Sequence, residues 1–232
     1  MKIMINIKNL KAWYTTNQLI LNGVNLNITD NTIIGLIGLN GAGKTTMIKT
    51  ICGIHEKYSI DKLIFNEREA TFTDDNFKLN RVAVFSENDA FDYWTFNEFL
   101  NFMMKSYNCQ CDKDYLKYLI DGFNFRQYLN YKKKDLSLGN KKKFFLITAF
   151  CLKRQLLILD EPIDGLDFES TQFIYKVFKE YKQYGSILMA THILESITSG
   201  CDKITVLKNG ILSELYDVAN EENVKILLGD LL

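Results

Sequence analysis

The stretch Gly38-Leu39-Asn40-Gly41-Ala42-Gly43-Lys44-Thr45-Thr46 decides how this chain of 232 residues folds. It satisfies the pattern G-x-x-x-x-G-K-[ST], whose glycines let consecutive backbone amides point inward toward phosphate oxygens. A continuous apolar run, Ile33–Ile37, precedes the loop and is typical of a buried parallel strand. The helix expected after the loop adds positive potential at its N-terminus. Because strand and helix flank the loop as the motif requires, we expect a nucleoside triphosphate site.

Two side chains of this loop have predicted roles of their own. Lys44 should reach the β- and γ-phosphates, where its charge assists catalysis, and the Thr45 hydroxyl should bind Mg²⁺. The residues that we expect around the phosphates are Gly38, Asn40, Gly41, Ala42, Gly43, Lys44, Thr45 and Thr46.

A second motif, Leu156-Leu157-Ile158-Leu159-Asp160-Glu161, joins four apolar residues to two carboxylates. Two adjacent carboxylates at the end of a buried strand are costly unless a cation lies beside them. A solvated strand end is the alternative for an isolated pair, and the phosphate loop upstream argues against it. We therefore expect Asp160 to bind Mg²⁺ and Glu161 to orient and deprotonate the attacking water.

Composition places the chain among ordinary globular proteins, with 47% apolar and 24% charged residues. Basic and acidic residues balance at 28 each, so any anion site must be local and we expect no nucleic-acid partner. The five cysteines favour a reducing compartment, and the lone pair Cys109 and Cys111 should be free thiols. The longest apolar stretch, Phe144–Leu152, is far shorter than the ~20 residues that cross a bilayer.

The order of the expected elements indicates an α/β fold with a parallel sheet. Residues 3–7 and 24–28 alternate like antiparallel strands, and Asn22-Gly23 reads as a tight turn. Thr95 to Glu98 form a capping box that opens a helix. Further strands are expected at 81–86, 155–159 and 186–190, and further helices at 44–52, 112–121 and 168–184 and from about Ser137.

Three more motifs complete a resemblance to the nucleotide-binding subunit of an ATP-binding cassette (ABC) transporter, which runs from about Ile3 to Leu212. Residues 136–141, LSLGNK, resemble the family signature LSGGQ, although Leu138 and Asn140 depart from the usual glycine and glutamine. Residues 163–167, IDGLD, resemble the loop after the acidic motif, and Thr191-His192 resembles the histidine switch. The order and spacing of all these motifs match the family.

The resemblance implies further contacts with the nucleotide. Ser137, with Gly139, would bind the γ-phosphate of ATP held by the opposite subunit, and we expect Ser137 to cap its helix as well. His192 would sense the γ-phosphate, Tyr14 or its neighbour Trp13 would lie against adenine, and Asp167 would join the site. Glu87 stands where the family has a glutamine that meets Mg²⁺ or water.

The same resemblance implies the organisation of the chain. It indicates one domain, residues 1–232, with a P-loop NTPase core, a parallel sheet and flanking helices. An N-terminal antiparallel β subdomain and this core occupy about 1–87 and 155–212, an inserted helical subdomain about 88–154, and a short tail 213–232. The two lysine triplets, 132–134 and 141–143, should be solvated helix flanks, and His55 has no expected role.

The predicted function is an ATP-binding and hydrolysing subunit that powers an ABC transporter. It would dimerise with a second copy or a related subunit, and couple to a separate transmembrane permease from the cytoplasmic face of the cell membrane. The segment Ser86-Glu87-Asn88 and the short tail resemble export systems for drugs, peptides or antibiotics. Phe91, Tyr93, Trp94 and Phe96 would line a groove for the membrane partner or fill the core of the helical subdomain.

Other classes of protein fit less well. A small GTPase would need N-K-x-D and D-x-x-G motifs, and the sequence contains neither. A chromosome or repair ATPase would need a long coiled coil before the signature, and only residues 88–136 separate Glu87 from Ser137. A stand-alone soluble ABC ATPase that acts on a protein or a cofactor-assembly partner remains the alternative.

Overall fold

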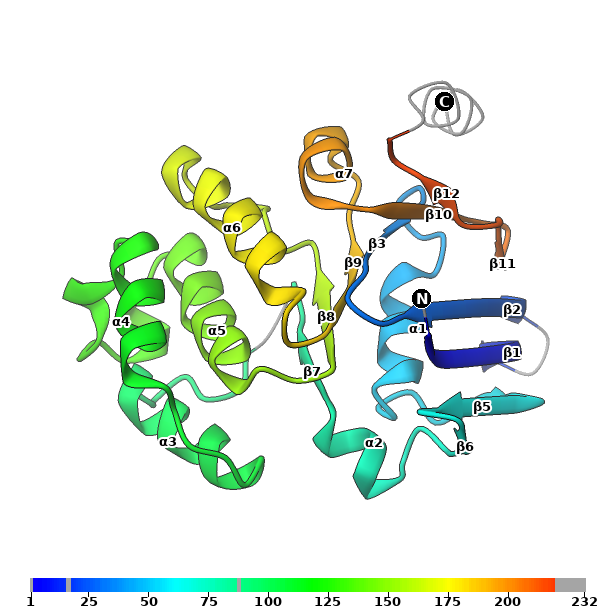
Figure 1. The fold of residues 1–232 in the computed structure, drawn as a ribbon, viewed down its shortest axis with the longest axis horizontal. Helices are drawn as coiled ribbons and strands as arrows, with labels where there is room; N and C mark the ends of the chain where they lie inside the picture. The colour runs from blue at the N-terminus through cyan, green and yellow to red at the C-terminus, as the bar shows by residue number, and fades with distance from the viewer. Residues whose placement is uncertain (1, 16–17, 87–88, 220–232) are drawn as a thin grey trace.

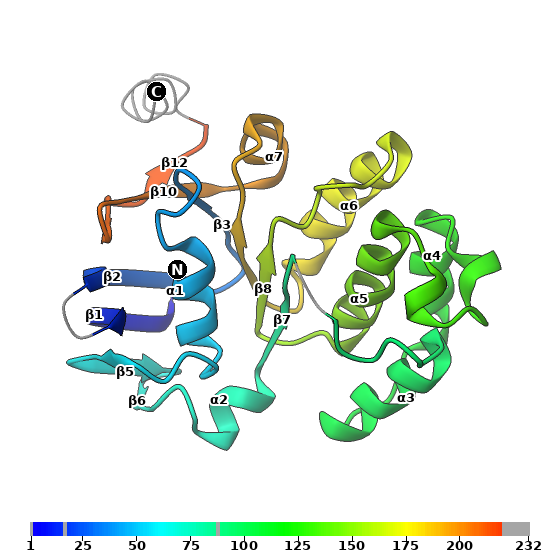
Figure 2. The same cartoon turned by 180° about the vertical axis from the view of Figure 1, so that it is seen from behind.

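The computed structural model describes residues 2–15, 18–86 and 89–219, apart from the side chain of Leu194. Within these residues, the antiparallel sheet lies at one end of the molecule and most of the helices at the other, with a parallel sheet between them (Figures 1 and 2). The expected α/β fold is confirmed.

The parallel sheet carries the motifs. Its order is β7-β8-β9-β3-β10, and each neighbouring pair in this order is parallel. The strands are β7 (Arg81–Val84), β8 (Leu156–Asp160), β9 (Ser186–Ala190), β3 (Ile33–Ile37) and β10 (Lys203–Lys208), with short β11 (Ile211–Leu212) and β12 (Tyr216–Asp217) antiparallel to β10. Every residue of β3, β8 and β9 is buried, as their unbroken apolar patterns indicate. Because β3, β9 and β8 are adjacent and parallel, their C-terminal ends lie at the same edge of the sheet.

The antiparallel sheet packs against α1 (Lys44–Ile51), which lies between the two sheets (Figure 1). Its members are β1 (Ile3–Thr15), β2 (Gln18–Thr29), β4 (Tyr58–Ser59), β5 (Lys62–Phe65) and β6 (Arg68–Glu69). One expectation fails here, since Asn22-Gly23 lies inside β2 and not at a hairpin turn. Gly23 has a φ of 82° at an irregular point of the β1–β2 register, so this dipeptide makes a bulge.

The helical region follows β7. Its helices are α3 (Phe96–Ser106), α4 (Lys113–Gly122) and α5 (Leu138–Leu152), with two 3₁₀ turns at Arg126–Tyr128 and Lys133–Asp135. The Thr95 capping box and the Ser137 N-cap are formed as the sequence predicts, and Asp112 is the N-cap of α4. The remaining helices are α2 (Asp75–Leu79), α6 (Phe168–Tyr181) and α7 (Leu194–Gly200).

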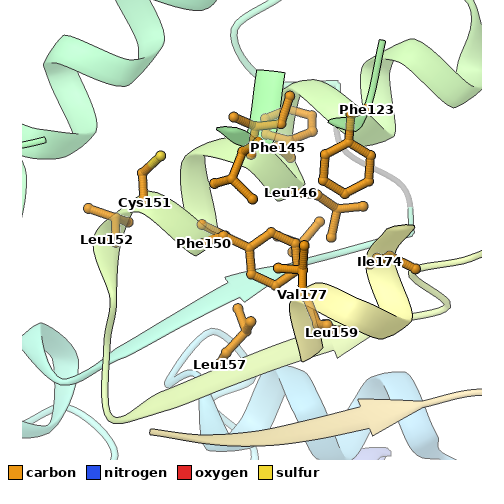
Figure 3. Packing of buried hydrophobic residues seen from close by; sticks show 14 of the residues in the cluster. Phe123, Phe145, Leu146, Phe150, Cys151, Leu152, Leu157, Leu159, Ile174 and Val177 are labelled. Carbon is orange, nitrogen blue, oxygen red and sulfur yellow. The ribbon is translucent and has the colours of Figure 1, made fainter. Parts of the chain in front are cut away.

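Helix α5 is the centre of the larger core. Phe150 of α5, Leu157 of β8 and Val177 of α6 belong to one cluster of buried side chains (Figure 3), and all three are fully buried. The long apolar stretch of the sequence is therefore a core helix, packed against the strand that carries the acidic motif. No helix among the described residues is long and apolar enough to cross a membrane.

The lysine triplets are only partly solvated, which corrects the expectation for them, because Lys132 and Lys134 are exposed but three of the other lysines are buried. Lys133 is 1% exposed and forms an ion pair of 2.8 Å with Asp92. Lys142 and Lys143 are also buried. A lysine can be buried where oxygen atoms accept hydrogen bonds from its ammonium group. The run of lysines in the sequence does not reveal these contacts, because each partner lies far along the chain.

Candidate nucleotide site

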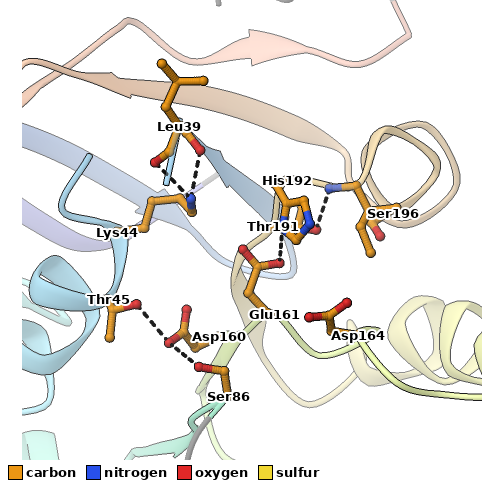
Figure 4. A network of polar contacts seen from close by, with 12 residues as sticks. Leu39, Lys44, Thr45, Ser86, Asp160, Glu161, Asp164, Thr191, His192 and Ser196 are labelled. Carbon is orange, nitrogen blue, oxygen red and sulfur yellow. Dashed lines mark hydrogen bonds and ion pairs between the residues drawn. The ribbon is translucent and has the colours of Figure 1, made fainter. Parts of the chain in front are cut away.

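The loop between β3 and α1 has the backbone shape that phosphate binding needs. Gly41 and Gly43 have φ values of 81° and 104°, a region that other residues rarely enter. At Gly43 a Cβ atom would also lie 2.8 Å from Ile20 Cγ2. Lys44 is buried, and its ammonium donates to the carbonyl of Gly38 at 2.7 Å (Figure 4). The backbone of the loop thus binds the ammonium of its own lysine.

A hydroxyl and a carboxylate meet beside this loop. Thr45 is the second residue of α1, and its Oγ1 donates to Asp160 Oδ2 at 3.0 Å. Ser86 Oγ donates to the same oxygen at 3.3 Å (Figure 4). Asp160 Oδ1 is buried and accepts no hydrogen bond from the residues that the structure describes. One carboxylate with two hydroxyls fits Mg²⁺, which usually keeps several waters and phosphate oxygens among its ligands.

The next residue, Glu161, lies at the ends of two adjacent strands. Its backbone amide donates to the carbonyl oxygen of Ala190, the last residue of β9, at 2.9 Å. Its φ is 49°, in the left-handed region. His192, two residues beyond Ala190, brings Nδ1 to 3.0 Å from Glu161 Oε2 (Figure 4). This oxygen accepts no well-aligned hydrogen bond within the described residues. Glu161 therefore lies beside His192 and lines the same pocket as the phosphate loop.

Tyr14 lies at the open rim of the same pocket. Its side chain is half exposed, and its hydroxyl is 3.2 Å from Thr46 Oγ1. Tyr14 and Glu161 both line this pocket, whose volume is about 360 Å³. Its remaining lining residues are Ile20, Leu39, Asn40, Gly41, Gly43, Lys44, Thr45 and Thr46. The structure thus brings the predicted adenine, phosphate and acidic residues to one hollow.

Ser137 and Gly139 lie elsewhere. Ser137 caps α5 and accepts from the Asn140 amide at 3.4 Å, and both it and Gly139 line a second pocket with Asp167. This pocket shares no lining residue with the one around Lys44. Within one copy of the chain, the signature therefore does not contribute to the phosphate pocket.

Asp167 is held by two bonds at the N-terminus of α6. Lys143 Nζ donates to it at 2.6 Å and the Ser170 amide at 2.8 Å. Partial burial acts to raise the pKa of Asp167, but the bonds from Lys143 and Ser170 outweigh it and bring the pKa to about 2. Asp167 therefore ties α5 to α6 beside the signature.

Sequence reasoning missed several side chains that contact the predicted site residues. Ser86 joins the Asp160 cluster, and the ring of His55 meets Tyr14 edge-on at 5.0 Å between centroids. Lys142 reaches the backbone beyond β8. Ser86 follows a buried strand, a signal that could have found it, whereas long-range packing alone reveals the others. Glu87 lies outside the described residues.

The sequence also matches a family model described as "ABC transporter" over residues 21–164, more than half of the chain. This chain belongs to the ABC transporter family. The matched range holds the phosphate loop, the signature and the acidic motif in the order seen above. It confirms the resemblance and identifies an ATP-binding subunit with ATPase activity.

Relatives of known sequence agree with membership in the ABC family. The putative ABC transporter ATP-binding protein AlbC of Bacillus subtilis is 31% identical over 227 residues, which cover 96% of this chain and 95% of AlbC. The zinc import ATP-binding protein ZnuC of Buchnera aphidicola is 30% identical, covering 91% of this chain and 83% of ZnuC.

A solved structure agrees as well. It is described as the ATP binding subunit of an ABC transporter and is 26% identical, with a TM-score of 0.83. The match covers 97% of this chain and 93% of the solved chain. The P-loop core, the antiparallel sheet and the helical region are therefore the fold of an ABC ATPase.

Proposed function

We propose that this chain binds ATP with Mg²⁺ at the loop after β3 and hydrolyses it to drive a membrane transporter. The observation that carries the proposal is that Thr45 and Glu161 line the phosphate pocket, and that Thr45 donates to Asp160, whose buried Oδ1 has no hydrogen-bond partner among the described residues. Mg²⁺, when bound, offsets the negative charge that gathers on the phosphates.

Each residue of the pocket has a chemical task in this proposal. The Lys44 ammonium exchanges the carbonyls that it now contacts for the β- and γ-phosphate oxygens. Thr45 and Asp160 hold the metal. Glu161 accepts a proton from the attacking water, and His192, 3.0 Å away, fixes the carboxylate and senses the γ-phosphate. Tyr14 lies against the adenine ring at the rim.

We propose that the active form is a dimer in which Ser137 and Gly139 of one copy complete the site of the other. The separation of the two pockets within one chain supports this arrangement, since the signature has no phosphate to bind in its own copy. A helix N-terminus with free amides suits the γ-phosphate. A related subunit could replace the second copy.

A groove on the helical region supports docking of a membrane subunit at the cytoplasmic face. Tyr93 and Phe102 are exposed at 69% and 41% and line this groove with Trp94. Phe96, by contrast, is fully buried and belongs to the core, and Phe91 packs against that core. We propose that an apolar segment of a separate permease occupies the groove, and that the chain divides into subdomains at about residues 88 and 154.

We further propose export as the direction of transport, on the resemblance carried by residues 86–88. ZnuC is named for import at a similar identity, so identity does not decide direction. A transport measurement does: with the permease in inside-out vesicles, added ATP should drive uptake of the cargo. Uptake driven only from the opposite orientation would overturn export.

The experiment for the ATPase assignment replaces the predicted base. Glu161→Gln should bind ATP but hydrolyse it at least a few hundredfold more slowly, within the ~10²–10⁴ expected for loss of a general base. Size-exclusion chromatography with ATP should then show a trapped dimer. Glu69→Gln, at an exposed position of β6, is the matched control and should behave as wild type. Near-normal turnover of Glu161→Gln would overturn the assignment.

A further inference from the structure

Lys142 connects the signature helix to the acidic motif through the backbone. Its ammonium donates to the carbonyl oxygen of Glu161 at 2.6 Å and to that of Asp164 at 2.6 Å. Lys142 lies in the first turns of α5, five residues after Ser137, whereas Glu161 and Asp164 belong to the turn after β8. One side chain thus joins two motifs that are distant in the sequence.

The Glu161 backbone needs such restraint. Its φ of 49° is unfavourable for a residue with a side chain and persists only where neighbouring contacts hold it. The Ala190 carbonyl holds the Glu161 amide from one side, and Lys142 holds the Glu161 carbonyl from the other. These two contacts fix the direction in which the carboxylate leaves the backbone.

Burial makes the link specific to the ammonium. Lys142 is 7% exposed, so water cannot readily replace it at the two carbonyls. Burial lowers the pKa of Lys142, while Asp164, Glu161 and Asp160 act to raise it. Lys179, exposed on α6, forms no hydrogen bond with this turn among the described residues, which makes it a matched control.

We propose that Lys142 is a positioning residue for hydrolysis, which holds the Glu161 carboxylate at the reactive geometry and transmits movement of the signature helix to it. The inference rests on the proposed role of Glu161 as base. A displacement of the start of α5, where a second copy would present ATP, pulls directly on the Glu161 carbonyl. Small displacements matter, because an error of about 1 Å at a reacting group can cost about 10²-fold in rate.

The first test separates rate from affinity. Lys142→Met should lower kcat by about 10–100-fold while the Kd for ATP changes less than threefold, since the contact lies behind the base and not on the phosphates. Lys142→Arg, which keeps a cationic donor, should recover part of the rate. Lys179→Met should match wild type. A kcat within twofold of wild type for folded Lys142→Met would overturn the inference.

The second test asks whether Lys142 acts through Glu161. In the Glu161→Gln background, adding Lys142→Met should lower the residual rate by less than twofold, because residues that act as a unit are not additive. An equal loss in both backgrounds would overturn the inference. If Glu161→Gln alone keeps normal turnover, the proposed function fails instead, so the two failures are distinguishable.

A third readout needs no nucleotide. The chain has two histidines, so the ring signals of His192 and His55 can be assigned by single replacements and followed by NMR. His192 lies 3.0 Å from the Glu161 carboxylate, and His55 contacts the Trp13 carbonyl and the Tyr14 ring. Lys142→Met should shift the His192 signal and spare that of His55. An unmoved His192 signal would overturn the inference even if kcat fell.

Discussion

Replacing Gly139 by alanine places a methyl group against the turn that follows the acidic motif. A Cβ at this position would lie 2.5 Å from the carbonyl oxygen of Gly165, which is backbone and cannot rotate away. An ordinary contact needs about 3.5 Å, so the start of α5 and this turn must separate by about 1 Å. The same separation would stretch the bonds of Lys142, which lies one turn along the helix.

The cost follows from these contacts. Overpacking costs about 1–3 kcal/mol, and a hydrogen bond to a charged group about 1.5–3 kcal/mol if it is lost. Two such bonds, each of 2.6 Å, run from Lys142 to Glu161 and Asp164, and both would weaken together. The higher helix propensity of alanine offsets up to about 1 kcal/mol of this loss of stability. We expect a net loss of about 2–4 kcal/mol and, for a chain of this size, a Tm lower by roughly 5–15 °C.

Thermal unfolding followed by circular dichroism measures this effect, and a steady-state ATPase assay measures the accompanying fall in kcat. Gly200→Ala is the control, because its Cβ would lie 3.3 Å from the Tyr175 ring, which can shift slightly. The control should lose little stability. A Gly139→Ala protein with a Tm within 2 °C of wild type and normal kcat would refute the reasoning, where 2 °C corresponds to about 1 kcal/mol or less.

Three further predictions concern Mg²⁺ binding, adenine binding and the pH dependence of stability. Asp160→Asn should raise the Mg²⁺ concentration for half-maximal ATPase by about tenfold or more, because a neutral amide attracts the cation less; a superimposable Mg²⁺ titration would contradict this. Tyr14→Ala should weaken ATP binding by about 5–100-fold, equivalent to about 1–3 kcal/mol of ring stacking, whereas Tyr14→Phe should not; equal Kd values for the two variants would count against stacking. Asp167 has its pKa lowered to about 2, below the unfolded value of about 3.9, so its stabilisation is present above about pH 4 and lost as the pH falls toward 2. The difference in unfolding free energy between wild type and Asp167→Asn should therefore shrink over that range, and a constant difference in urea titrations would contradict it.

The sequence predicted the parts of the site that depend on neighbours along the chain. The glycine loop, its flanking strand and helix, and the carboxylates at the end of β8 all follow local rules of backbone shape and burial. The Thr95 capping box and the Ser137 N-cap are local as well. Such patterns survive folding because each is satisfied within a few residues.

Errors arose where tertiary contacts overrule local preference. Asn22-Gly23 has the composition of a hairpin turn, yet the long β1–β2 pair absorbs its left-handed glycine as a bulge beside Asn9. Lys133, Lys142 and Lys143 read as a solvated charge run, but each finds oxygen partners on another element. The residues next to these lysines in the sequence do not indicate those partners.

The sequence could place the signature only through resemblance. Its helix cap is predictable from Ser137, but the role that we propose for Ser137 depends on a second copy that no local pattern describes. The structure adds the physical reason, since the signature pocket and the phosphate pocket have no lining residue in common. Glu87, expected beside Mg²⁺, stays a prediction because it lies outside the described residues.

The most direct test of the account mixes two inactive variants. Lys44→Ala should lose productive ATP binding, and Ser137→Arg should block the signature of its own copy. In a mixed dimer, one site would pair the intact loop of one copy with the intact signature of the other. The account predicts that the mixture hydrolyses ATP well above the sum of the two variants measured alone. A mixture no more active than that sum, under conditions where the wild-type dimer forms and exchanges subunits, would contradict it.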